Sequence, residues 1–148
     1  MKKIYLAGFD VFREDAAEYG IKLKALCARY GFEGLYPLDN EADSAEDIFR
    51  GNLALIDRCD ILLCNLNPFR GNEPDSGTSF EVGYGFSKGK KIVGYLNDGR
   101  TLIEKLGVTC GGYAVEDFSM AVNLMLGCAS TIIEGGPEDA LKMLCEVE

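Results

Sequence analysis

The chain has 148 residues, of which 47% are hydrophobic, and its 24 acidic side chains outnumber the 15 basic ones, for a formal net charge of −9. This length suits one domain with a proper core, expected over residues 1–148, and the charge disfavours nucleic acid or an acidic membrane surface as a partner. The absence of histidine excludes Ser-His-Asp and Cys-His nucleophile systems, zinc sites that use histidine, and imidazole as a general base. We expect a small ligand, and any catalysis must use carboxylates, thiols, Tyr, Lys, amides or a cofactor.

The six cysteines are spread along the chain without a C-x-x-C pair, so the spacing of a zinc ribbon or a thioredoxin motif is absent. Most of them stand among apolar residues and are expected to be buried. Met1 leads directly into a strand pattern without a signal segment, and no apolar run approaches the ~20 residues of a membrane span. We therefore expect a reduced, cytoplasmic enzyme or binding module.

The first part of the chain alternates apolar runs of strand length with amphipathic stretches. Lys3–Gly8 is predicted as a strand that ends in a glycine turn, and a helix follows over residues 13–30. Residues 32–37 are a second strand candidate. Ser44 is predicted to cap a helix that ends near Arg58.

The most hydrophobic strand lies near the middle of the chain. Residues 60–66 are predicted as a strand whose apolar residues follow one another without alternation, as expected for a central parallel strand that is covered on both faces. A loop of turn-forming residues follows over 67–77, and Thr78 is predicted to cap a helix that runs to about Lys88. Residues 91–96 are predicted as the fourth strand.

The last third is glycine-rich and irregular over 97–115, apart from a short helical piece at 102–106. We predict a helix over 118–126, a strand at 131–133 and a helix over 137–145. The alternation predicts an α/β protein with a doubly wound, flavodoxin-like, five-stranded parallel sheet and helices on both faces.

Ligands of such sheets bind beyond the carboxyl ends of the strands, which directs attention to the loop and helix that follow the third strand. Asp75 stands in that loop and Glu81 in the first turns of the helix. Because Glu81 lies three residues after Thr78, one interpretation is a capping box without a catalytic role. The other is a partly buried carboxylate with a chemical task, because the surrounding helix is apolar.

A carboxylate at this place suits nucleophilic attack on a glycosidic carbon, with a second acid to protonate the leaving group. Asp75 and Glu81, together with Tyr5 near the end of the first strand, supply such parts without histidine. Gly77 and Thr78 at the helix start also suggest an anion site. The Asp75 carboxylate would repel a phosphate and favour hydroxyl donors, so a neutral nucleoside is preferred over a nucleotide.

These residues resemble the nucleoside 2-deoxyribosyltransferase family. The pieces that carry the resemblance span most of the chain in order: Ile4 to Gly8 with Val11-Phe12, Pro37 to Asn40, Asn52, Cys59-Asp60, Asn65-Leu66 with Pro68 to Gly71, Pro74-Asp75, Gly77-Thr78, Phe80 to Gly83 and Asn123 to Leu126. The block around Glu81 and the Pro-Phe-Arg-Gly loop together are its most specific part.

The resemblance implies a double displacement in which Glu81 attacks C1′ of a 2′-deoxynucleoside and a free nucleobase leaves, after which a second nucleobase accepts the sugar. It implies that Tyr5 orients Glu81 and that Asp75 binds deoxyribose hydroxyls. It also implies that Asn123 and Met125 enter the site of a neighbouring subunit in a homo-oligomer, either a dimer or a trimer of dimers. We expect no cofactor and no metal.

Asn52 departs from the pattern of those family members that carry an aspartate there to exchange a proton with the base. An amide can form hydrogen bonds with a base but cannot protonate it. Asp39, Glu41 or water would then serve, and Asn52 could also be an ordinary polar residue on an exposed helix face. The expected substrate-binding residues are Gly8, Phe12, Asp39, Asn40, Glu41, Asn52, Phe69, Gly77, Asn123 and Met125.

Several of these residues have simpler interpretations. Phe12 and Phe69 either stack on a base or cover the core. Without the resemblance, residues 123–126 are best interpreted as part of an amphipathic core helix.

Two alternative functions stay open. One is a 2′-deoxynucleoside 5′-monophosphate N-glycosidase, a related hydrolase that carries a serine suited to phosphate where Asp75 stands here. The other is a non-catalytic, flavodoxin-like or receiver-like module that senses nucleotides. Asn65 at the end of the third strand argues against the receiver variant, which needs an acidic cluster there.

Overall fold

The computed structural model describes residues 1–147, so Glu148, the last residue of the expected domain, lies outside the described residues. Five parallel strands form one sheet in the order β2-β1-β3-β4-β7. Their bounds are Lys3–Ala7 (β1), Glu33–Leu35 (β2), Ile61–Asn65 (β3), Lys91–Leu96 (β4) and Thr131–Glu134 (β7). Counted along the chain, this is the flavodoxin-like order 2-1-3-4-5, which confirms the predicted fold class.

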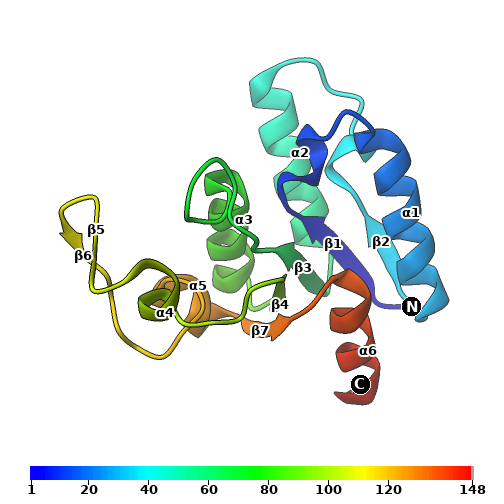
Figure 1. The fold of residues 1–148 in the computed structure, drawn as a ribbon. Coiled ribbons are helices and arrows are strands. Elements are labelled where there is room, and N and C mark those ends of the chain that lie inside the picture. The colour runs from blue at the N-terminus through cyan, green and yellow to red at the C-terminus, as the bar shows by residue number, and fades with distance from the viewer. Residues whose placement is uncertain (148) are drawn as a thin grey trace.

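Helices cover both faces of this sheet (Figure 1). One face carries α1 (Ala16–Arg29) and α6 (Pro137–Val147), and the other carries α2 (Ala45–Arg58), α3 (Ser76–Ser87) and α5 (Leu124–Ala129). Ser44 caps α2 as predicted, because its Oγ accepts the Asp47 N–H at 3.1 Å.

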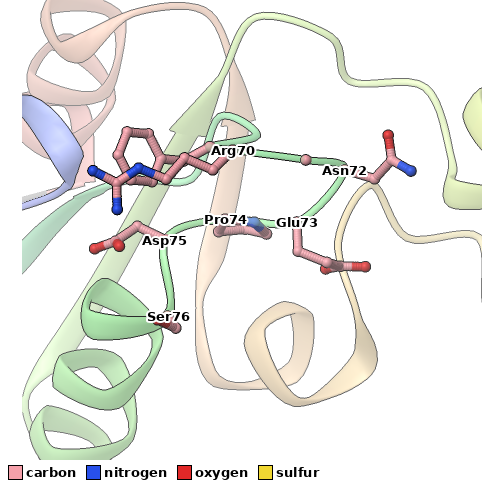
Figure 2. Close-up of a pocket in the computed structure, with 8 residues that line it drawn as sticks. Arg70, Asn72, Glu73, Pro74, Asp75 and Ser76 are labelled. Carbon is pink, nitrogen blue, oxygen red and sulfur yellow. The ribbon is translucent and has the colours of Figure 1, made fainter.

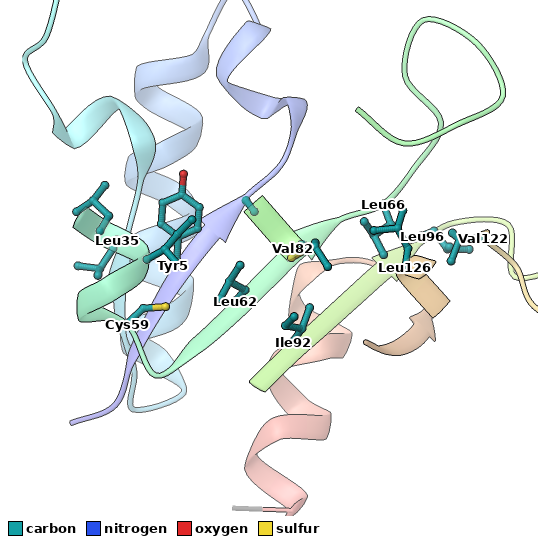
Figure 3. Close-up of a cluster of buried hydrophobic side chains, with 14 residues drawn as sticks. Tyr5, Leu35, Cys59, Leu62, Leu66, Val82, Ile92, Leu96, Val122 and Leu126 are labelled. Carbon is teal, nitrogen blue, oxygen red and sulfur yellow. The ribbon is translucent and has the colours of Figure 1, made fainter. Parts of the chain in front are cut away.

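Successive side chains of β1 enter different hydrophobic clusters, because side chains alternate across a strand. Ile4 and Leu6 belong to the cluster under α1 and α6, whereas Tyr5 and Ala7 belong to the cluster under α2, α3 and α5. Figure 3 shows the Tyr5 ring within the second cluster, with its hydroxyl directed away from the other side chains. Tyr5 is fully buried, and its hydroxyl lies toward the carboxyl edge of the sheet.

The predicted helix over 118–126 is wrong in its first two thirds, since α5 begins at Leu124 with Asn123 as its N-cap. The backbone that precedes α5 forms hydrogen bonds with α4 (Leu102–Leu106). The carbonyl of Met120 accepts a hydrogen bond from the Leu102 N–H, and the carbonyl of Ala121 accepts one from Lys105 Nζ. Carbonyls engaged in this way do not continue a helical ladder.

A short antiparallel ribbon and two short 3-10 turns were not predicted. The ribbon pairs β5 (Thr109–Cys110) with β6 (Tyr113–Ala114) and projects away from the main sheet (Figure 1). The turns span Phe9–Phe12 and Pro37–Asp39 and follow β1 and β2. Both turns lie at the carboxyl edge of the sheet.

The expectation of buried cysteines is correct for half of them. Cys27, Cys59 and Cys64 are buried, whereas Cys110, Cys128 and Cys145 are exposed, and all are free thiols. Within residues 1–147, no helix is both long and apolar enough to cross a membrane.

Candidate active site

A cavity of about 550 Å³ lies at the carboxyl edge of the sheet, between α2, α3 and the turns that follow β1 and β2. Seven residues that the sequence marked for catalysis or binding line it together: Gly8, Phe12, Asn40, Asn52, Asp75, Gly77 and Glu81. The rest of the lining is Val11, Pro37, Leu38, Ala42, Ile48, Phe49, Leu53 and Phe80.

Glu81 is the best-organised polar group in this cavity. The Tyr5 hydroxyl donates a short hydrogen bond to Glu81 Oε2. No hydrogen bond from the described residues reaches Oε1, so one oxygen is held by the protein while the other is available to a ligand. The hydrogen bond joins β1 to α3, two elements separated by most of the first half of the chain.

The capping-box interpretation of Glu81 is wrong, because Thr78 is not the N-cap of α3. Asp75 is the N-cap, and its Oδ2 accepts the backbone N–H of Thr78 at 3.0 Å and the Thr78 hydroxyl at 2.8 Å. Since the helix begins three residues earlier than predicted, its first turn is capped without Glu81. The Glu81 side chain is therefore left for the cavity.

Burial raises the pKa of Glu81 from 4.5 to about 7; the Tyr5 hydrogen bond opposes this rise and the negative charge of Asp75 adds to it. Burial and the neighbouring Glu81 raise the pKa of Tyr5, so its hydroxyl stays protonated and remains a donor. A carboxylate that ionises near neutral pH beside a permanent hydrogen-bond donor is typical of a catalytic group.

Asp75 faces the same cavity from the start of α3. Both of its capping hydrogen bonds go to Oδ2, and no group among residues 1–147 donates to Oδ1. The cap fixes the carboxylate next to the helix N-terminus, where a negative charge is stabilised. Oδ1 can therefore accept hydrogen bonds from hydroxyl groups of a ligand.

The floor of the cavity beside β1 requires glycine. Gly8 has φ of 156°, and a Cβ there would lie 2.8 Å from the Cβ of Asn65 and 3.0 Å from Asp10 Oδ2. Asp10 is buried and accepts two 3.3 Å hydrogen bonds from Asn65 Nδ2, and its burial raises its pKa. This pair ties the turn after β1 to the end of β3.

The opposite wall consists of amides and apolar side chains from α2 and the turn after β2. Asn40 Nδ2 donates to Asn52 Oδ1 at 3.2 Å. Ile48 and Phe49 stand on the same wall and are each 42% exposed. The Phe49 and Phe80 rings meet with centroids 5.8 Å apart. This wall suits a flat, partly polar ring such as a nucleobase.

Asp39 and Glu41, the two acids expected to replace an aspartate at position 52, do not line the cavity. The Asp39 carboxylate accepts Lys24 Nζ at 2.7 Å and the Tyr36 N–H at 2.9 Å, which directs it toward α1. Glu41 is exposed.

Phe69 lies outside the cavity and stacks on its rim. Its ring lies 4.8 Å from that of Phe9 and 5.5 Å from that of Phe12, centroid to centroid, and the Arg70 guanidinium covers the Phe69 ring at 4.5 Å. Figure 2 shows the loop of Arg70 around an adjoining hollow of about 340 Å³, with Arg70 and Asp75 extending to the same side. Phe69 supports Phe12, which does line the cavity.

Asn123 and Met125 also lie away from Glu81. They line a separate, mainly apolar hollow of about 430 Å³ between α3 and α5, together with Phe86. Met125 is 74% exposed, so the interpretation of this segment as a core helix fails at that residue. Asn123 caps α5 by accepting the Leu126 N–H at 3.1 Å.

Sequence reasoning missed the apolar wall residues and Asp10. Helix α2 carries more apolar residues than it buries: Leu55 and Ile56 are buried, whereas Ile48 and Phe49 are exposed. This excess of apolar residues is the signal that could have identified Ile48 and Phe49. Within residues 1–147, no group of three or more His, Cys, Asp or Glu side chains is placed to hold a metal ion.

Comparisons with known proteins identify a family for this chain. Residues 4–125 match the family model described as nucleoside 2-deoxyribosyltransferase. The structure resembles a 2-deoxyribosyltransferase of Leishmania mexicana with a TM-score of 0.90 and 36% identity, over 99% of this chain and 98% of that one. An uncharacterized protein of Schizosaccharomyces pombe is 36% identical over 70% of this chain, which spans about half (54%) of that relative.

More distant structures share the fold. A 2-deoxyribosyltransferase of Bacillus psychrosaccharolyticus has a TM-score of 0.63 and 21% identity, over 93% of this chain and 88% of that one. The CMP N-glycosidase BcmB of Clostridium botulinum has a TM-score of 0.57 and 18% identity, over 99% of this chain and 100% of that one. Because the family model covers well over half of the sequence, the chain belongs to the nucleoside 2-deoxyribosyltransferase family.

Proposed function

We propose that this protein transfers the 2-deoxyribosyl group from one nucleobase to another through a covalent intermediate on Glu81. The observation that carries the proposal is the Glu81 carboxylate itself: Tyr5 holds Oε2, and Oε1 is open to a cavity of about 550 Å³. A cavity of this size suits a nucleoside. Breaking or transferring the N-glycosidic bond of deoxynucleosides is the chemistry of the family to which the chain belongs.

The first half of the reaction forms the bond between Glu81 and the sugar. A lone pair of Oε1 attacks C1′ of the 2′-deoxynucleoside, and the electrons of the C1′–N bond leave with the base. In the second half, a ring nitrogen of another base attacks C1′, the C1′–O bond breaks, and the carboxylate is regenerated while the base loses its N–H proton to water. Tyr5 keeps the carboxylate in place throughout.

Asp75 supports recognition of a neutral deoxynucleoside. Its free Oδ1 accepts hydrogen bonds from sugar hydroxyls, and its negative charge repels a 5′-phosphate. A 2′-hydroxyl would crowd Glu81 and withdraw electrons from the oxocarbenium-like centre, which favours the 2′-deoxy sugar. Asp75 and Tyr5 thus complete the catalytic set with Glu81.

The proposal includes a homo-oligomer in which Asn123 and Met125 reach the site of a neighbouring subunit. Its support is their position outside the cavity of their own chain, beside an apolar hollow, with Met125 largely exposed. Sedimentation should show an oligomer for the wild-type protein and a shift toward monomer for Met125→Asp. A monomeric wild-type protein with full activity would contradict this part.

The test of the proposed activity is incubation with 2′-deoxyinosine and free adenine. Formation of 2′-deoxyadenosine and hypoxanthine supports the transferase. Release of hypoxanthine with free deoxyribose, and without 2′-deoxyadenosine, would identify a hydrolase. Faster cleavage of a deoxynucleoside 5′-monophosphate than of the nucleoside would contradict the role given to Asp75, and no turnover of any donor would leave a binding module.

A further inference from the structure

The amide pair on the cavity wall is built into the fold. Asn40 Nδ2 donates to Asn52 Oδ1, and the Asn40 amide lies against the backbone of α2 at Gly51. A Cβ at Gly51 would stand 2.7 Å from Asn40 Nδ2 and 2.8 Å from its Cγ, so this contact requires glycine. The two amides are therefore bonded to each other in the absence of a ligand.

The lining of this cavity contains two ionisable side chains among residues 1–147, Asp75 and Glu81, and both stand on α3 or its cap. The wall opposite them carries amides and apolar groups. Asp39 and Glu41 flank Asn40 in the sequence, but Asp39 is bound to Lys24 and to the Tyr36 backbone, and Glu41 is exposed. The described chain thus places a nucleophile beside the sugar and no proton donor of its own beside the base.

We infer that Asn40 and Asn52 bind the nucleobase by hydrogen bonds alone and that the protein therefore ranks its donors by the acidity of the departing base. The inference rests on the proposed function and names the specificity of that site. As the C1′–N bond breaks, its electron pair moves into the base ring and Oε1 of Glu81 forms the new bond to C1′. The base leaves as an anion and takes its proton from water afterwards.

The amide pair assists this departure through its N–H groups. Asn52 Oδ1 already accepts from Asn40, and nothing among residues 1–147 accepts from the Asn52 NH₂ group, so this group can donate to a ligand. An N–H donor stabilises a ring nitrogen or carbonyl oxygen that gains negative charge. Bases that hold negative charge well are therefore favoured, and a 6-oxopurine should leave faster than adenine.

The experiment measures base release in single turnovers with the donor alone, so that no acceptor step contributes. The donors share one ring system and differ in base acidity: 6-chloropurine 2′-deoxyriboside, 2′-deoxyinosine and 2′-deoxyadenosine. We expect the rate to fall in that order, by about tenfold or more between the first and the last, as for a reaction without a general acid. Equal rates, or the reverse order, would overturn the inference.

Asn52→Asp supplies the missing acid with nearly the same shape. It should accelerate base release from 2′-deoxyadenosine by on the order of tenfold or more and flatten the dependence on base acidity, because a positioned general acid contributes that much. Asn97→Asp, an exposed position outside this cavity, adds the same charge and should leave the order of donors unchanged.

The base-release rates of the wild-type protein with the three donors test the inference even if Asn52→Asp fails to fold. The proposed function and the role of the amide pair are contradicted by different results. Absence of base release from every donor would contradict the proposed function. Base release and exchange that proceed at rates independent of base acidity would contradict only the role of the amide pair.

Discussion

The two walls of the cavity are built in different ways. The α3 wall is anchored in the core: Glu81 is tied to the fully buried Tyr5, and Asp75 is fixed by the cap of its own helix. The wall formed by α2 and the turn after β2 carries amides and the half-exposed Ile48 and Phe49. The sheet and its core thus position the proposed nucleophile, whereas surface elements form the wall where we propose that the base binds.

The largest expected effect is the loss of the nucleophile. Glu81→Ala should lower base exchange by at least about 10³-fold, because the covalent step has no other carboxylate held by Tyr5. Initial rates with 2′-deoxyinosine and adenine measure it. Glu14→Gln removes an exposed glutamate and is the matched control. Retention of wild-type activity by Glu81→Ala would remove the distinction between the two walls.

Tyr5→Phe should have the next largest effect, a decrease of roughly 10- to 100-fold in kcat, since Glu81 loses the donor that orients it. The wild-type kcat/KM should lose activity as the pH falls through about 7, where Glu81 becomes protonated. Because the Tyr5 hydrogen bond lowers the pKa of Glu81, this limb should move to higher pH in Tyr5→Phe. A full pH profile of both proteins checks the shift, and an unmoved limb contradicts it.

The buried charge of Glu81 on the α3 wall should also lower the stability of the folded protein. The pKa of Glu81 is raised from 4.5 to about 7 in the folded state, so the folded protein binds more protons than the unfolded chain between these values. Stability therefore falls as the pH rises through this window, and the cost is fully present above pH 7. Glu81→Gln should raise the free energy of unfolding at pH 8 by about 1–3 kcal/mol, and by less at pH 5.

Urea denaturation at the two pH values measures this difference. Glutamine keeps an oxygen that accepts from Tyr5, so the variant separates the charge from the hydrogen bond. A Glu81→Gln protein that is less stable than wild type at pH 8 would show that the buried charge is compensated in the fold.

The smallest effect is expected on the other wall. Phe49→Ala removes part of the apolar surface that faces the base and should weaken binding of the donor by about 3- to 10-fold, as expected for burial of one exposed ring face. The rate of base release at saturating donor should stay close to wild type, because Tyr5 and Glu81 are untouched. A loss confined to kcat would place Phe49 with the catalytic wall instead.

Much of the fold follows from local patterns in the sequence. The continuous apolar run of β3 and the Ser44 cap of α2 are features that a single segment determines. The start of α5 was mispredicted because the carbonyls of residues 120 and 121 bond to α4, a contact that depends on tertiary structure. The start of α3 was displaced because Asp75 and Thr78 are both good caps, and spacing does not choose between them.

The site was predictable where residue chemistry is distinctive and less so where packing decides. Glu81 and Asp75 were found from their residue types and order, and Asn52 from the family resemblance; all three line one cavity. Phe49 was not found, because an apolar helical stripe has the same pattern whether it covers a core or a ligand. The binding of Asp39 to Lys24 joins two elements whose approach depends on the packed sheet.

The most direct test of the covalent mechanism is the mass of the intact protein after incubation with 2′-deoxyinosine and no acceptor. We expect an added mass of one deoxyribosyl group on the peptide that contains Glu81. This added mass should be lost on addition of adenine and should be absent from Glu81→Gln. Two results would contradict the central role of Glu81. One is an unmodified wild-type protein when the reaction is quenched during the first turnover, and the other is an adduct on another residue.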